Sequence, residues 1–125
     1  MNPKAMNNLM REIFDDCVKT HHSGQKEYAN DKTNVFANFE RIADRLDLSK
    51  QEVLVVYLLK HIDGIVSHVK GHKSQRENVR GRIKDAIVYL SILWGMEDVE
   101  DNNPDDVLYT SDSSSTFTFT ENPDE

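Results

Sequence analysis

Apolar residues recur every three or four positions through most of the first 96 residues, a period that is typical of amphipathic helices. The first such segment starts with Asn2, a suitable N-cap, and Pro3, a residue suited to the first helical position. It predicts a helix over residues 3–20, with Cys17 as a small buried residue. The apolar stripe of this helix consists of Met6, Leu9, Met10, Ile13, Phe14, Cys17 and Val18.

Two further helices are expected in the middle of the chain. The second covers residues 34–46, where apolar side chains again follow the helical period. Ser49 and Glu52 have the spacing of a capping box, which predicts the start of a third helix that continues to about Lys70. Residues 53–59 of this helix are apolar on every side, so its first half is expected to be central in a bundle.

A fourth helix is expected to follow Gly71, with Ser74 and Glu77 as a second capping box, and to run to about Met96. One face of this helix carries Val79, Ile83, Ala86, Ile87, Leu90 and Trp94. The opposite face carries Glu77, Gly81, Asp85 and Tyr89, with Val88 and Ile92 beside them. Because both faces contain apolar residues, another helix or a second subunit is expected to cover Val88 and Ile92. The sequence therefore predicts an all-α fold, a four-helix bundle.

Charge is distributed unevenly along the chain, whose formal net charge is −7. Ten acidic residues and no Lys or Arg occur from Glu97 onward, which leaves the preceding part at about +3. The same end is rich in Ser, Thr, Asn and Pro, a composition that buries too little apolar surface to fold. We therefore expect a helical domain over residues 1–98 and a disordered acidic tail over residues 99–125. Within the tail, Thr116–Thr120 alternates like a strand and could dock on a protein partner; a mobile, solubilising tail is the alternative.

Cysteine content and hydropathy restrict the cellular setting. Cys17 is the single cysteine, which excludes an internal disulfide and a cysteine-based zinc site. No apolar run approaches the roughly 20 residues of a membrane span, so no membrane association is expected. A reducing, cytoplasmic location is expected, in the host cytoplasm if the protein is viral.

Carboxylates suggest a metal site at one end of the crevice between the third and fourth helices. Glu77 and Asp85 lie on the face that turns toward the third helix, where Lys60 and Asp63 are available and His61 is a turn round. Carboxylates that converge from neighbouring helices are the usual way in which a bundle holds a divalent cation.

Structural roles for the same residues remain open. Glu77 would also serve as the acid of a capping box, and Asp85 would also pair with Arg82 or Lys84. The histidines have basic neighbours or lie at helix ends, which disfavours a metal site built on them.

The one basic patch of the sequence is the run from Lys70 to Arg76, extended by Arg80 and Arg82. Together with the free N–H groups at the start of the fourth helix, it is suited to binding phosphates. As a surface for a nucleic-acid duplex it is small and lacks a recognition-helix pattern, so duplex binding is not expected.

Several short motifs between Lys26 and Leu93 resemble those of small bacterial and phage proteins in the MazG-like, all-α NTP pyrophosphohydrolase superfamily. The matching residues are Lys26-Glu27-Tyr28, Phe36-Ala37-Asn38-Phe39, Lys60, Glu77, and Asp85 with Tyr89.

This resemblance implies hydrolysis of an NTP or dNTP to the monophosphate and pyrophosphate with Mg²⁺, in a homo-oligomer such as a dimer. Glu77 and Asp85 are the implied catalytic residues. The implied metal ligands are Glu27, Asp63, Glu77 and Asp85. The implied nucleotide- or phosphate-binding residues are Lys60, Arg76, Arg80, Asn38 and Tyr89.

A non-catalytic function is the alternative. Arg80 and Gly81 stand where the superfamily usually has two acids, and an arginine repels Mg²⁺ at close range. Either Asp63 replaces a ligand, or the chain binds a nucleotide or a protein partner through its basic patch and acidic tail without hydrolysis.

Overall fold

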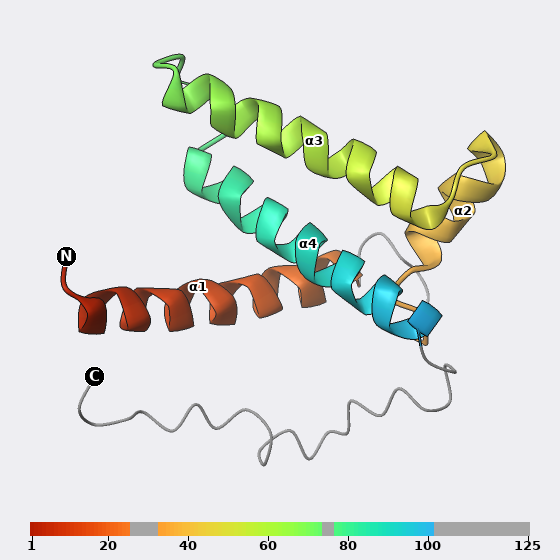
Figure 1. Ribbon diagram of the computed structural model, residues 1–125, viewed down its shortest axis with the longest axis horizontal. Coiled ribbons are helices and arrows are strands. Elements are labelled where there is room, and N and C mark those ends of the chain that lie inside the picture. The colour runs from red at the N-terminus through yellow and green to blue at the C-terminus, as the bar shows by residue number, and fades with distance from the viewer. Residues whose placement is uncertain (26–32, 74–76, 102–125) are drawn as a thin grey trace, which may run out of the picture.

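The computed structural model describes residues 1–25, 33–73 and 77–101. Within these ranges the chain is all-helical, as expected, with α1 (Pro3–Gly24), α2 (Ala37–Leu46), α3 (Lys50–Val69) and α4 (Val79–Asp101). Helix α4 packs against both α1 and α3, and α2 packs against α3 (Figure 1). Most of the expected acidic tail, including Thr116–Thr120, lies outside the described residues. Among the helices that are described, none has the length and apolar character to cross a membrane.

The starts of α1 and α3 confirm the two sequence predictions made for them. Asn2 Oδ1 accepts a hydrogen bond of 2.8 Å from the N–H of Ala5 at the start of α1. At α3, Ser49 Oγ accepts from the Glu52 N–H at 3.0 Å, and Glu52 Oε1 accepts from the Ser49 N–H at 3.1 Å. Each bond satisfies a backbone donor that has no partner within its helix.

Helix α4 begins at Val79, so the predicted start at Ser74 is wrong. The side chain of Asn78 accepts the N–H of Arg80 at 2.9 Å, and its backbone carbonyl accepts the N–H of Gly81 at 2.9 Å. This local bonding fixes the first turn of the helix after Asn78. Glu77 therefore precedes α4 instead of lying in its first turn. The helix also continues to Asp101, past the domain boundary expected at residue 98.

Two left-handed residues end α2 and α3 in the same way. Gly71 has φ of 99°, and the next residue, His72, donates its N–H to the carbonyl of Ser67 at 3.0 Å. Asp47 has φ of 54°, and Leu48 after it bonds back into α2. This arrangement satisfies carbonyl groups that the helix end leaves without partners. Gly71 ends α3, as the sequence predicted.

The buried core joins α2, α3 and α4. Leu54 of α3 and Met96 of α4 are fully buried. The cluster around them is completed by Phe39, Ala43 and Val53. Full burial of a leucine or methionine side chain contributes about 1.5–3 kcal/mol, so this cluster holds the N-terminal end of α3 to the C-terminal part of α4.

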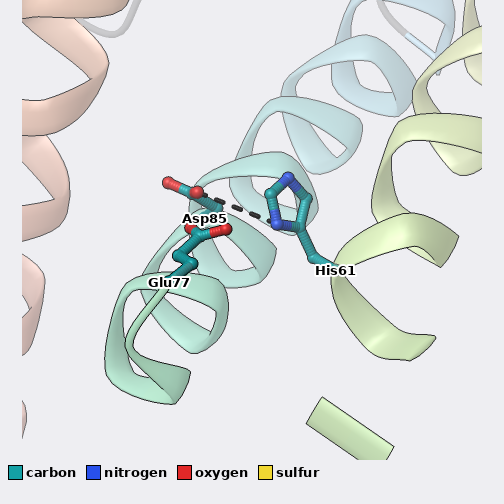
Figure 2. A group of neighbouring side chains, drawn as sticks. All are labelled: His61, Glu77 and Asp85. Carbon is teal, nitrogen blue, oxygen red and sulfur yellow. Dashed lines mark ion pairs between the residues drawn. The ribbon is translucent and has the colours of Figure 1, made fainter. Parts of the chain in front are cut away.

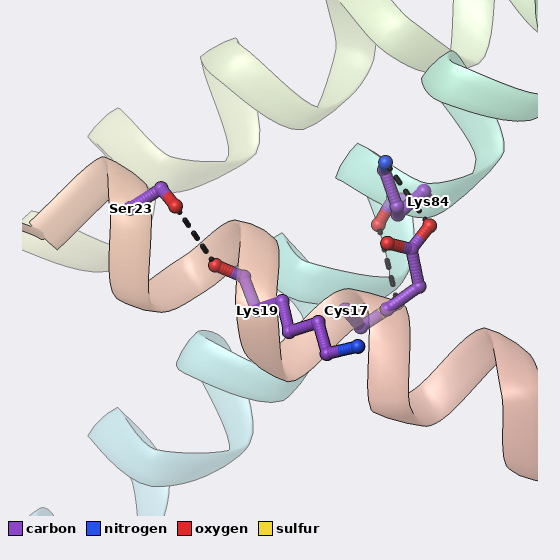
Figure 3. A network of polar contacts seen from close by, with 5 residues as sticks. Cys17, Lys19, Ser23 and Lys84 are labelled. Carbon is purple, nitrogen blue, oxygen red and sulfur yellow. Dashed lines mark hydrogen bonds and ion pairs between the residues drawn. The ribbon is translucent and has the colours of Figure 1, made fainter.

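Helix α1 docks on α4 through a small buried residue and an ion pair (Figure 3). Cys17 is 7% exposed, as expected, and its Sγ donates to the Lys84 carbonyl at 3.9 Å. Lys84 Nζ in turn lies 3.2 Å from Asp16 Oδ2. Burial, with a further contribution from Asp16, raises the pKa of the Cys17 thiol. A neutral thiol is a poor nucleophile, so Cys17 is a packing residue.

A large part of the apolar surface remains exposed, which corrects the expected central position of α3. In α3, Val53 and Leu54 are buried, whereas Val56 is 61% exposed. In α4, Trp94 on the apolar face is 74% exposed. The reason is that α1 packs mainly against α4 and not against α3, so one side of α3 is left uncovered. The other exposed apolar residues of these two helices are Val55, Leu59, Val66, Val69, Ile83 and Leu90.

Candidate functional site

The helical period brings polar residues of α3 to the side that faces α4. From the buried Leu54, steps of three or four residues lead through Tyr57 and His61 to Gly64. Tyr57 stacks on Tyr89 of α4, and His61 meets both Tyr89 and the preceding turn of α4. The contact between these two helices is therefore apolar at one end and polar at the other.

His61, Glu77 and Asp85 form the central cluster of this polar end (Figure 2). One nitrogen or oxygen atom from each side chain lies within 4.8 Å of the other two. His61 Nδ1 and Asp85 Oδ2 lie 3.8 Å apart. The side chains of His61 and Asp85 are 16% and 32% exposed, and that of Glu77 is 41% exposed. The cluster is thus partly withdrawn from water but open on the Glu77 side.

The electrostatics of the cluster favour an added positive charge. Burial raises the pKa of Asp85, and the neighbouring Glu77 raises it further, while His61 and Lys84 act in the opposite direction. The negative form of Asp85 is therefore disfavoured on balance. His61 Nδ1 is buried and makes no hydrogen bond, a situation that costs about 1–3 kcal/mol for a polar atom. A bound cation would stabilise both groups, because carboxylates and imidazole nitrogen are its usual ligands.

An aromatic cluster supports the histidine from the apolar side. The His61 and Tyr89 rings have their centroids 5.5 Å apart. Tyr89 is stacked on Tyr57 with centroids 6.2 Å apart and planes 6° apart. The buried Phe39 of α2 meets both tyrosines edge-on at 6.2 Å. Such pairs add about 0.5–1.5 kcal/mol each beyond burial and restrict where the imidazole can lie.

A cavity of about 270 Å³ lies beside Asp85, among α1, α2 and α4. Asn38, Phe39 and Tyr89 are among its lining residues, and His21 and Gln25 line it from α1. The volume is close to the lower limit of about 300 Å³ for small-molecule pockets. Aromatic rings and amide groups are suited to stacking on a nucleobase and bonding to its edge. The chemistry of this cavity fits a nucleoside.

A second cavity of about 700 Å³ opens at the other end of the cluster and is basic. Lys73, Arg80 and Arg82 line it together with Glu77. Arg82 Nε lies 3.9 Å from Glu77 Oε2. The Arg82 side chain also lies directly over Gly64, where a Cβ atom would overlap the guanidinium. Three cationic side chains on one cavity are suited to binding phosphate groups.

Five of the predicted site residues lie in the cluster or in one of the two cavities. Glu77 and Asp85 come together with His61, and Arg80 lines the basic cavity. Asn38 and Tyr89 share the smaller cavity with Asp85, and Asn38 Oδ1 also accepts from Arg41 Nη2 at 2.8 Å.

The other predicted residues are not part of the cluster. Lys60 and Asp63 are exposed on α3, and Asp63 is not among the three clustered ligands. Glu27 and Arg76 lie outside the described residues.

His61 and Arg82 are the site residues that the sequence pattern did not single out. Lys60 and Asp63 were expected in the crevice, whereas the side of α3 that faces α4 carries His61 and Gly64. The spacing from the apolar Leu54 and Tyr57 is the signal that would have selected His61.

Comparison of the chain with protein-family models, with curated proteins and with solved structures found no match.

Proposed function

We propose that this chain binds a nucleoside triphosphate and hydrolyses it to the monophosphate and pyrophosphate, as a divergent member of the MazG-like superfamily in the cytoplasm. One observation carries the proposal: the cluster connects two cavities of different chemistry. Asp85 lines the small aromatic cavity, Glu77 lines the large basic cavity, and both carboxylates belong to the cluster with His61. A nucleotide has the same order of parts, with a nucleoside at one end and phosphates at the other.

Two observations support a divalent cation at the cluster: the buried Nδ1 of His61, which makes no hydrogen bond, and the two carboxylates near it. His61, Glu77 and Asp85 would hold it. When bound, such an ion neutralises phosphate charge and makes a water molecule more acidic. Arg80 and Arg82 would neutralise the remaining phosphate charge through directed N–H groups.

The nucleoside end is bound by different interactions. Tyr89 offers aromatic surface to a base, with the buried Phe39 packed edge-on against it, and the Asn38 amide offers a donor and an acceptor. In the reaction, the oxygen of water bonds to the α-phosphorus while the bond to the α,β-bridging oxygen breaks. Pyrophosphate then leaves toward the basic cavity.

A binding function without hydrolysis is the second candidate, favoured by the position of Arg82. Its guanidinium lies close to Glu77 and so competes with a cation for that carboxylate. In this case the basic cavity would bind a nucleotide's phosphates directly, and the acidic tail would be available to a protein partner.

We also propose that a second copy of the chain covers the exposed apolar faces of α3 and α4. Trp94 is 74% exposed, and an aromatic side chain carries about 150–250 Å² of surface, so this residue alone offers on the order of 100–200 Å². Val56 and Leu90 are also more than half exposed. A stable interface needs about 800 Å² from each partner, so the proposed interface has to include further exposed apolar residues of both helices.

The test of the proposed hydrolysis is release of pyrophosphate from a panel of NTPs and dNTPs with Mg²⁺ or Mn²⁺. The Asp85→Asn variant removes a clustered carboxylate, and Asp63→Asn is the matched control because Asp63 is exposed on the neighbouring helix. We expect turnover that requires a cation, persists in Asp63→Asn and is lost in Asp85→Asn. Nucleotide binding without turnover in the wild type would instead support the second candidate.

A further inference from the structure

The donor atoms of the cluster differ in kind, and this difference bears on which cation they bind. Two are carboxylate oxygens, from Glu77 and Asp85, and the third is an imidazole nitrogen of His61. Mg²⁺ prefers an all-oxygen set and keeps several of its waters. Imidazole nitrogen is a better ligand for first-row transition ions than for Mg²⁺, and affinity for sites of mixed donors rises along that series from Mn²⁺ onward.

The geometry of the cluster is close to that of a bound ion. Two donors that are each about 2.1 Å from one ion lie no more than about 4.2 Å apart. His61 Nδ1 and Asp85 Oδ2, at 3.8 Å, already meet this limit. The widest pair in the cluster, at up to 4.8 Å, needs a movement of less than about 1 Å, which the half-exposed Glu77 side chain can make.

The position of His61 does not depend on the ion. Its ring lies beside Tyr89, which is stacked on Tyr57 and meets the buried Phe39. Its Nδ1 is buried and makes no hydrogen bond. The nitrogen is thus directed toward the carboxylates by packing, as a preorganised ligand would be.

We propose that His61 makes this site selective for a first-row transition ion such as Mn²⁺ or Zn²⁺ over Mg²⁺, with His61, Glu77 and Asp85 as its protein ligands. The inference rests on the proposed function for its site but concerns the identity of the ion. It replaces the all-carboxylate set that included Asp63, which is exposed and outside the cluster. Arg82, 3.9 Å from Glu77, opposes every cation at this site and therefore weakens binding without changing its selectivity.

Cation binding by the full chain without nucleotide tests the inference separately from catalysis. Mn²⁺ is the probe, because Zn²⁺ would also bind exposed histidines outside the cluster, such as His22. Equilibrium titration followed by electron paramagnetic resonance gives the Mn²⁺ dissociation constant, and competition gives that of Mg²⁺. We expect Mn²⁺ to bind at least tenfold more tightly than Mg²⁺.

Three substitutions sharpen the test. His61→Gln should weaken Mn²⁺ binding at least tenfold and leave Mg²⁺ binding within about threefold. His61→Asp restores an all-oxygen set and should shift the preference toward Mg²⁺. Arg82→Gln should strengthen the binding of both ions. Asp63→Asn, the control on the same helix, should change neither.

Equal affinity for the two ions, together with an unchanged Mn²⁺ affinity in His61→Gln, would overturn the inference. Circular dichroism checks whether His61→Gln folds. If it does not, electron paramagnetic resonance of the wild-type protein tests the inference, because bound Mn²⁺ should show coupling to a directly bound nitrogen. Absence of that coupling would equally overturn the inference.

Failure of the proposed function is distinct, since it would appear as tight Mn²⁺ binding without pyrophosphate release. Mg²⁺-supported turnover lost in Asp85→Asn but unchanged in His61→Gln would keep the function and refute the ion assignment.

Discussion

His61 Nδ1 on α3 faces Asp85 Oδ2 on α4 at 3.8 Å, too far for a hydrogen bond but within the spacing of two ligands on one cation. Because the two residues lie at the contact between α3 and α4, the packing of these helices determines the geometry of the site. Each residue is placed by apolar neighbours: His61 by Tyr89, and Asp85 by the turn that contains the buried Ala86.

Asp85→Asn should separate function from stability. Burial and Glu77 raise the pKa of Asp85, so the negative carboxylate is disfavoured in the folded chain without a cation. The substitution should therefore leave the free energy of unfolding within about 1 kcal/mol of wild type, or increase it. It should also weaken Mn²⁺ binding at least tenfold. Chemical denaturation and metal titration measure the two effects, and a loss of several kcal/mol would contradict this role for Asp85.

Gly64→Ala should displace Arg82 and weaken phosphate binding. A Cβ atom at residue 64 would overlap the Arg82 guanidinium, whereas alanine is the better helix former by about 1 kcal/mol. A charged hydrogen bond contributes about 1.5–3 kcal/mol, so affinity for inorganic triphosphate should fall about tenfold or more while the melting temperature is maintained. Arg82→Ala should lower the affinity for triphosphate by a similar factor, and combining it with Gly64→Ala should lower the affinity little further. Additive losses would show that the two residues act separately.

Trp94→Asp should disrupt self-association. It places a charge on an exposed apolar face that also carries Leu90, and burying an unpaired charge is strongly unfavourable. Light scattering should give the mass of an oligomer for the wild type and a smaller mass for the variant. A wild-type protein that is monomeric at every concentration would contradict the proposed interface.

His21 should make the fold less stable in mild acid. Burial, and then the neighbouring His22, lower the pKa of His21 below its usual 6.5. The unfolded chain therefore binds a proton more readily, and stability is present above pH 6.5 and is lost as the pH falls toward the lower pKa of the folded state. His21→Gln should reduce this loss. Proton NMR of the imidazole measures the pKa directly, and a value above 6.5 would refute the account.

The elements of the fold that depend on local sequence were predictable. The capping pair Ser49 and Glu52, the terminating Gly71 and the buried Cys17 were each predicted correctly, because neighbouring residues determine them. The predicted start of α4 was wrong, because the side chain of Asn78 caps the helix, a role that the spacing of Ser74 and Glu77 had assigned to Ser74. Two similar local signals competed there, and the sequence does not rank them.

The candidate site was predictable only in part because it depends on the register between two helices. Asp85, Asn38 and Tyr89, which the motifs had singled out, line one cavity. His61 and Asp63 are two residues apart, which is about 200° around a helix, so only one of them can face α4. That choice is made by the packing of Leu54 and Tyr57. The exposure of Val56 and Trp94 was also unpredictable, since the periodicity of one chain does not show which partner covers a face.

Diffraction at the manganese absorption edge tests the central claim most directly, on crystals of the full chain soaked in Mn²⁺ and a triphosphate that resists cleavage between its α- and β-phosphates. The account predicts an anomalous peak about 2.0–2.3 Å from one atom each of His61, Glu77 and Asp85. It also predicts the base beside Tyr89 and the terminal phosphates beside Arg82. A manganese peak at Asp63, or a nucleotide bound away from both cavities, would contradict the account.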